Sequence, residues 1–186
     1  MTMDQKELFK NELICCMPKL VEEILLYLPE QQVYGISFLT TDDFYGMYVG
    51  FNTKEFMEEQ IKKESANEYQ RWMPTEWPFS DEELPTDFNK ELYKNLVEII
   101  DHNKETDFMR PSDGKWAFAL FLIEAINEAV RAIPKETFTE HGYEQNSIVF
   151  SVTMSDGDYM DEMFLDSLKK MNKDSLIMEL LETLEN

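Results

Sequence analysis

The fold is decided by two neighbouring segments, VYGISFL at residues 33–39 and FYGMYVGF at residues 44–51. Both are rich in aromatic and branched side chains, which pack well on the surface of a sheet. The residues between them, Thr40-Thr41-Asp42-Asp43, are typical of a turn. The two segments therefore predict an antiparallel β-hairpin over residues 33–51.

A third strand is predicted much later in the chain, at residues 147–154. Its sequence SIVFSVTM places Ile148, Phe150, Val152 and Met154 on one side of an extended chain. This alternation predicts a strand with one buried face, ended by Asp156-Gly157-Asp158. We expect it to share a sheet with the hairpin.

Helical periodicity accounts for most of the remaining chain. The first helix is expected over residues 4–28, kinked or divided at Pro18. Thr53 is the expected N-cap of the second helix, and the helix at 115–133 is the most apolar. The other predicted helices cover residues 88–103, 159–171 and 173–185. The sequence thus predicts a single domain over residues 1–186, of the α+β class, with a small antiparallel sheet of about three or four strands covered by several helices.

The charge of the chain restricts its partners. Its 186 residues include 38 acidic and 17 basic ones, giving a net charge of −21 and a pI near 4.3. Nucleic-acid readers and proteins bound to anionic membranes need basic surfaces, so we expect no nucleic-acid partner and no membrane partner. Because 43% of the residues are hydrophobic and 13% aromatic, the chain is expected to fold.

Two further features indicate a cytoplasmic protein. The first residues show no secretory signal pattern, and no window has 18 uninterrupted apolar residues. The two cysteines, Cys15 and Cys16, are adjacent in an apolar helical pattern. Neighbouring Cα atoms are too close for normal disulfide geometry, so we expect two reduced thiols with at least one in the core.

A search for catalytic and cofactor motifs does not support an enzyme. His102 and His141 lack the spacing of a zinc site, and the glycine-rich motifs that bind nucleotides or form a nucleophile elbow are not found. His102 is expected near a helix end and His141 in a turn before Gly142. We therefore expect no cofactor, no metal site and no identifiable catalytic residue.

The densest group of carboxylates is Asp156, Asp158, Asp161 and Glu162. It departs from the calcium-loop pattern because Asp161 stands where that loop needs glycine. One interpretation is a strand-to-helix turn with acids at the helix N-terminus. The other is a carboxylate-based site of a small-molecule or metal-dependent enzyme.

The most unusual segment is YQRWMPTEWPF at residues 69–79, with two tryptophans beside or near prolines. Trp72 and Trp77 are interpreted as anchors that hold an irregular segment on the core. Alternatively, Arg71, Trp72 and Trp77 form a partner-binding patch, since tryptophan and arginine are common at binding hot spots.

The order of these features resembles the bacterial domain of unknown function 4303 family. The resemblance is carried by the hairpin running into Phe51-Asn52-Thr53-Lys54-Glu55, by the element Arg71-Trp72 to Glu76-Trp77, and by the closing stretch Ser167 to Asn172. Lys54 and Met171 depart from that pattern. The resemblance implies a cytoplasmic bacterial α+β protein without established catalytic residues, loosely associated with the immunity proteins of toxin systems.

These observations lead to three functional hypotheses. The first is a non-enzymatic acidic interaction module of the toxin-immunity type, whose surface neutralises a basic protein such as a nuclease toxin. The second is the carboxylate-based enzyme. The third is an acidic soluble domain with no charge-driven partner.

Overall fold

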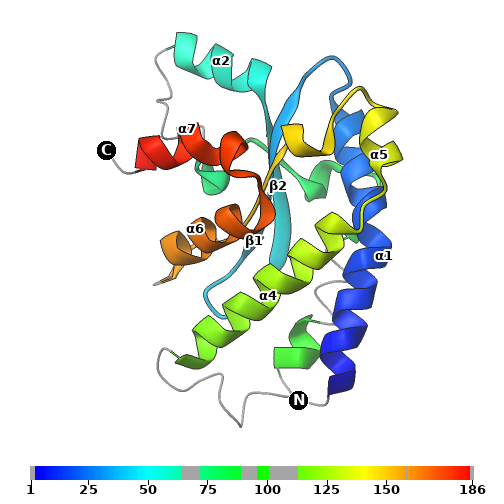
Figure 1. Cartoon of the computed structure of the whole chain (residues 1–186), viewed down its shortest axis with the longest axis vertical. Helices are drawn as coiled ribbons and strands as arrows, with labels where there is room; N and C mark the ends of the chain where they lie inside the picture. Colours follow the sequence, from blue (N-terminus) through cyan, green and yellow to red (C-terminus); the bar gives the residue numbers. More distant parts are fainter. Residues whose placement is uncertain (1–2, 64–71, 89–95, 101–112, 158, 185–186) are drawn as a thin grey trace.

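The structure is a computed structural model that describes residues 3–63, 72–88, 96–100, 113–157 and 159–184. Its sheet has four strands in the order β3-β2-β1-β4 (Figure 1). They are β1 (Val33–Thr40), β2 (Met47–Thr53), β3 (Phe79–Ser80) and β4 (Val149–Met154). The predicted α+β class is confirmed.

The pairing of the strands confirms the hairpin and refines the sheet. β1 and β2 pair antiparallel, with Phe38 opposite Val49. β4 joins the other side of β1, as expected, but runs parallel to it, with Ser37 opposite Ser151. The sheet is therefore mixed, since only the pairings of β2 with β1 and with β3 are antiparallel.

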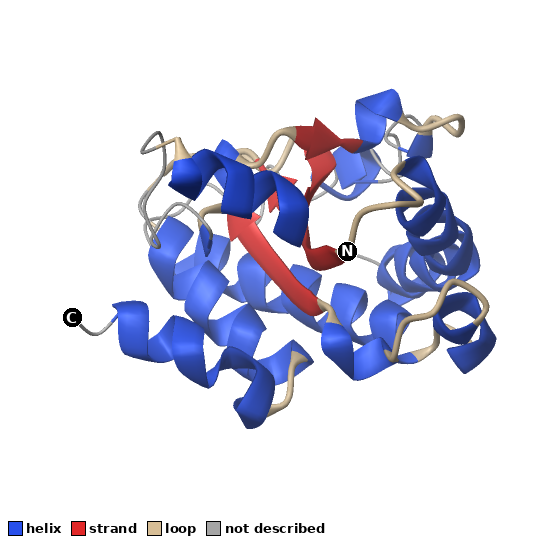
Figure 2. Cartoon of the chain, turned by 90° about the horizontal axis from the view of Figure 1, so that it is seen from above, coloured by secondary structure: helices blue, strands red, loops and turns tan. Residues whose placement is uncertain are grey.

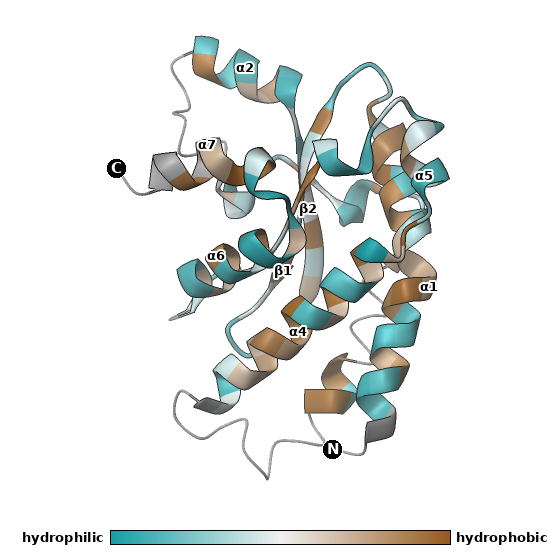
Figure 3. Ribbon diagram, viewed as in Figure 1, coloured by the Kyte–Doolittle hydropathy of each residue, from teal (hydrophilic) through white to brown (hydrophobic). Residues whose placement is uncertain are grey.

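One face of the sheet packs against α1 (Met3–Tyr27) and α4 (Asp113–Arg131), which also contact each other (Figure 1). Ile36 and Phe38 of β1 point to this side, into a core that includes Leu13 and Ile123. Figure 3 shows hydrophobic residues on the strands and on parts of α1 and α4, whereas α2 is largely hydrophilic. Pro18 lies inside α1 without dividing it.

The second face of the sheet is also covered, so the prediction of one buried face for residues 147–154 is wrong. Every residue of β4 is buried, because α6 (Met160–Met171) and residues 72–77 lie over the side that the prediction left exposed. Figure 2 shows helices on both sides of the strands. Gly35 makes this possible in β1: a Cβ there would lie only 2.7 Å from the Trp77 ring.

Side chains form hydrogen bonds with the backbone groups on the outer edge of β4. Asn172, just after α6, accepts a hydrogen bond from the Phe150 N–H through Oδ1 at 2.8 Å and donates through Nδ2 to the Phe150 carbonyl at 2.7 Å. The Ser167 hydroxyl accepts from the Val152 N–H at 2.8 Å and lies 2.9 Å from the Val152 carbonyl. These two residues take the place of a neighbouring strand.

The remaining helices agree closely with the expected segments. α2 (Lys54–Lys62) has Thr53 as its N-cap, with the Thr53 side chain accepting from the Phe56 N–H, as predicted. α6 and α7 (Asp174–Leu184) correspond to the two C-terminal predictions, and the short α5 (Lys135–Thr139) follows α4. Of the helix expected at 88–103, residues 89–95 and 101–103 lie outside the described residues.

The structure shows no disulfide between Cys15 and Cys16, and their placement differs from the expectation. Cys15 is exposed on α1, and Cys16 is half-buried and packs against the core. Neither thiol is fully inside the core, because the buried side of α1 is formed by Phe9, Leu13, Met17 and Leu20.

Candidate functional site

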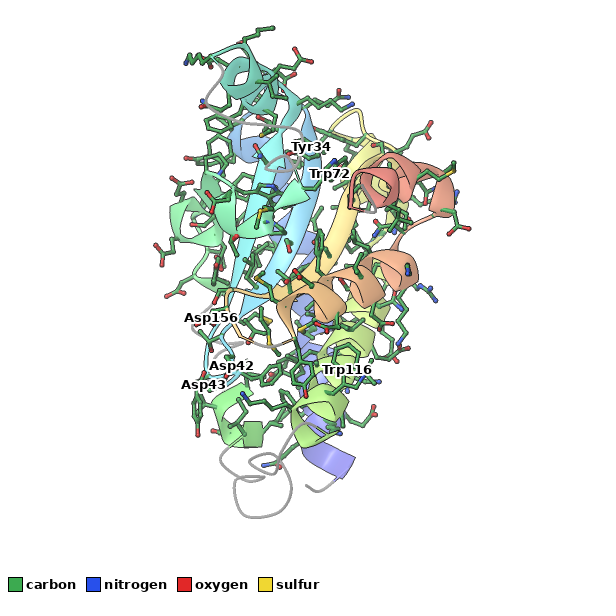
Figure 4. All side chains as sticks on the ribbon, turned by 90° about the vertical axis from the view of Figure 1, so that its left-hand side faces the viewer. Tyr34, Asp42, Asp43, Trp72, Trp116 and Asp156 are labelled. Carbon is green, nitrogen blue, oxygen red and sulfur yellow. The ribbon has the colours of Figure 1, made fainter. Side chains whose placement is uncertain are left out.

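Three carboxylates lie close together at the edge of the sheet where the strands β1 and β4 end. Because β1 and β4 are parallel, their carboxyl ends lie side by side, with Thr40 opposite Met154. Asp42 and Asp43 follow β1, and Asp156 follows β4. Figure 4 labels the three side chains along this edge.

The turn between β1 and β2 is fixed from inside the protein. Phe44 has a φ of 59°, which is uncommon for a residue with a side chain, and its ring is fully buried. The ring contacts Phe118 of α4 edge-to-face, with centroids 5.0 Å apart. The backbone N–H of Phe44 donates to the Thr41 carbonyl at 2.9 Å, and the Thr40 hydroxyl donates to the Gly46 carbonyl at 2.7 Å. This anchored turn carries Asp42 and Asp43 at a defined position.

Each of the two turn carboxylates has a defined partner. The Thr41 hydroxyl donates to Asp43 Oδ1 at 2.7 Å, and this bond is the main reason why the pKa of Asp43 lies below its usual value. Asp42 Oδ2 pairs with Nζ of Lys115 on α4 at 2.5 Å. The hydrogen bond from Thr41 therefore favours the charged form of Asp43, and Asp42 forms an ion pair with Lys115.

Asp156 connects the hairpin turn to the end of β4. Its Oδ1 accepts a hydrogen bond from the Asp42 N–H at 3.3 Å. The next residue, Gly157, has a φ of +98°, and a Cβ at that position would collide with the Asp42 carboxylate. The close approach of the two chain segments thus depends on glycine at position 157.

The negative potential extends from this edge across β2. Burial raises the pKa of the Tyr48 hydroxyl, and the charges of Asp156 and Asp81 raise it further. Asp81 is only 4% exposed, and its Oδ1 accepts from the Val49 N–H at 2.9 Å. Burial is also the main cause that raises the pKa of Asp81. Tyr48 therefore lies in the field of carboxylates on both sides of it.

The predicted carboxylate group is only partly described. Asp161 and Glu162 are exposed in the first turn of α6, Asp156 is exposed before it, and Asp158 lies outside the described residues. We use the name acidic edge for Asp42, Asp43, Asp156, Asp161 and Glu162. Sequence analysis missed Asp42 and Asp43 as site residues, because only the parallel pairing of β1 with β4 places them beside Asp156.

The acidic edge has little enclosed space. Asp161 lines a cavity of about 40 Å³ together with Trp72, Thr153 and Phe164, which is room for a few water molecules. Within the described ranges, no three His, Cys, Asp or Glu side chains are grouped so that they could hold a metal ion. The acidic edge is a charged surface that can attract and orient a cationic partner.

Residues 72–77 of the aromatic segment lie over the sheet, and Figure 4 labels Trp72 close to Tyr34 of β1. Trp72 is 6% exposed and Trp77 is half-buried, and both contact the Tyr34 ring edge-to-face, with centroids 5.7 and 6.1 Å apart. Arg71 lies outside the described residues. The two tryptophans have the packing of core anchors, and their contact with a partner stays a prediction.

His141 lies in a turn before Gly142, whose φ is +79°, as expected, and His102 is outside the described residues. Among the described helices, none has the length and apolar character needed to cross a bilayer.

Comparison with known families places most of the chain in one of them. A family model described as "Domain of unknown function (DUF4303)" matches residues 17–173, which include the whole sheet, the acidic edge and the aromatic segment. No curated protein matches the chain, and no solved structure matches it.

Proposed function

Because this chain belongs to the domain of unknown function 4303 family, a family without an assigned activity, we propose its function from its surface: it is an acidic interaction module of the toxin-immunity type. In this proposal the acidic edge binds a basic protein, such as a nuclease toxin, and blocks its function. The observation that carries the proposal is that Asp42 and Asp43, which follow β1, lie beside Asp156, which follows β4, with Asp161 and Glu162 exposed in the first turn of the next helix.

The local charge supports this assignment. Among the described residues, the ion pair found for the acidic edge is that of Asp42 with Lys115. The whole chain, these carboxylates included, carries a net charge of −21. A concentrated negative surface on a negatively charged protein accelerates association with a basic partner by about 10- to 1,000-fold at low salt.

The sheet edges favour recognition by side chains over strand addition. Asn172 and Ser167 occupy the outer edge of β4, and on the outer side of β2 the Val49 N–H is bound to Asp81 while Gly50 and Phe51 pair with β3. A partner that adds a strand needs unpaired backbone groups. The anchored acidic edge presents charged side chains instead.

The test starts with finding the partner. The full-length tagged protein is used to co-purify proteins from its native bacterial host at low salt, and each candidate is then purified. The proposal predicts a basic protein whose association rate constant falls steeply between about 20 and 500 mM salt, because the steering is screened. The absence of any basic partner, or an association rate that ignores salt, rejects the proposal.

A further inference from the structure

A cavity at the end of β4 away from the acidic edge, which we call the basic cavity, is lined by cationic side chains. Its volume is about 300 Å³, and it lies between the end of α4, the end of α6, the start of α7 and the 3-10 turn η4 (Gln145–Ser147). Arg131, Lys170 and Lys173 line it, and none of its described lining residues is Asp or Glu. In a chain with 38 acidic and 17 basic residues, three cations around one cavity without a carboxylate is an unusual composition.

The cations differ in what they already bind. Lys170 pairs with Glu124 of α4 at 3.5 Å, so its charge is directed away from the cavity. Arg131 Nη2 donates to the Lys170 carbonyl at 3.3 Å, which uses one of the five N–H donors of a guanidinium group. Arg131 and Lys173 are both exposed at the cavity. They come from different helical ends, 42 positions apart in the chain.

The rest of the lining gives the cavity an apolar floor and a fixed wall. Val130, Ile148 and Phe150 are buried, and Leu176 is half-buried at the start of α7. Asn172 forms part of the wall, and its amide is held by both backbone groups of Phe150. Gln145 is held as well, because its Nε2 donates to the Val130 carbonyl at 3.3 Å. The volume is at the lower end of the range for small-molecule sites, about 300–1,000 Å³.

We propose that this cavity binds a small organic anion. Its carboxylate or phosphate group lies between Arg131 and Lys173, because a guanidinium and an ammonium group together suit an anionic oxygen cluster. Its apolar body lies against Val130, Ile148 and Leu176. The site is separate from the acidic edge, because Phe150 and Met154 are four residues apart on the extended strand β4, roughly 13 Å, and Asp156 follows beyond Met154.

Four probes separate the parts of this proposal: benzoate, phenyl phosphate, inorganic phosphate and uncharged phenol. Each is titrated into the ¹⁵N-labelled full-length protein at constant ionic strength, and amide shifts are followed by NMR. Benzoate and phenyl phosphate share one ring, so their comparison distinguishes a carboxylate site from a phosphate site. We expect saturable shifts centred on Val130, Gln145 and Lys173, and at least tenfold weaker binding for phenol and for inorganic phosphate.

Matched variants test the role of the two cations. Arg131→Gln combined with Lys173→Gln is expected to weaken binding of the better ring anion by at least tenfold. The control, Lys62→Gln combined with Lys63→Gln, removes the same charge from the exposed end of α2 and should bind like the wild type. If the Arg131 and Lys173 double variant fails to fold, the shift map of the wild type decides. Shifts outside the cavity, no saturation with either ring anion, equal loss in both double variants, or equal affinity for phenol each overturn the proposal.

Discussion

Asn172 is the residue on which the outer edge of β4 most depends, so Asn172→Ala should destabilise the fold strongly. The substitution removes the bonds to the Phe150 N–H and carbonyl and a third bond, from Nδ2 to the Leu168 carbonyl at 2.9 Å. Phe150 is only 2% exposed. A buried backbone group without a partner costs about 1–3 kcal/mol.

The loss of stability in Asn172→Ala depends on whether water can replace the hydrogen bonds of the Asn172 amide. Two orphaned groups on Phe150 give an upper value of about 6 kcal/mol. Asn172 and Phe150 also line the basic cavity, so water can reach part of this edge and reduce the loss. We therefore expect Asn172→Ala to lower the free energy of unfolding by about 2–4 kcal/mol, a large part of the roughly 5–15 kcal/mol of a typical domain.

Urea unfolding followed by circular dichroism measures this loss. Lys169→Ala is the matched control, because Lys169 is an exposed neighbour on α6 and its truncation should change stability by less than about 0.5 kcal/mol. Asn172→Asp keeps the acceptor for the Phe150 N–H but puts a carboxylate against the Phe150 carbonyl, so it should also destabilise. A loss in Asn172→Ala no greater than that of the control would refute the reasoning.

Three other substitutions test separate contacts. Asp81→Asn should be more stable than wild type at pH 7 and equal to it at low pH, because the raised pKa of Asp81 means that wild-type stability is present below the unfolded-state pKa and is lost as pH rises through the folded-state pKa. Urea unfolding from about pH 3, which is below the unfolded-state Asp pKa of roughly 3.9, to about pH 8 measures the difference, and parallel pH curves contradict the prediction. Gly157→Ala should lose more thermal stability than Gly142→Ala, because both have positive φ, costing roughly 1–2 kcal/mol, but only at Gly157 does a Cβ meet the Asp42 carboxylate; equal losses reject the predicted collision. Tyr143→Phe should cost about 1–3 kcal/mol, because the hydroxyl accepts from the Val33 N–H at 2.9 Å and donates to the Gln31 carbonyl at 3.1 Å; calorimetry that shows no change argues against this anchor.

Local patterns in the sequence predicted the elements that depend on neighbouring residues. The hairpin at 33–51 follows from two short runs and one turn, and the Thr53 cap follows from a side chain three residues before its partner N–H. Such features need no knowledge of distant parts of the chain. The same holds for the amphipathic helices, whose period is visible within a few turns.

Features that depend on distant contacts were missed or incompletely predicted. The second face of β4 is buried because residues 72–77 and α6 cover it, and the period-two pattern of the strand does not show this. The acidic edge needs the parallel pairing of β1 and β4, and the basic cavity joins Arg131 to Lys173 across two helical ends. The stretch Ser167 to Asn172 was noted as a family-like pattern, and its role at the β4 edge became visible only in the structure.

The most direct test of the proposed function is the association rate constant with the purified basic partner at about 20 mM salt. Two charge-matched variants are compared with the wild type: Asp42→Asn with Asp43→Asn and Asp156→Asn, and Glu136→Gln with Glu140→Gln and Glu144→Gln, whose side chains are exposed on and after α5. The proposal predicts that the first variant associates about tenfold more slowly than the second, since steering depends on where the charge lies. Equal association rates for the two variants would contradict a role for the acidic edge.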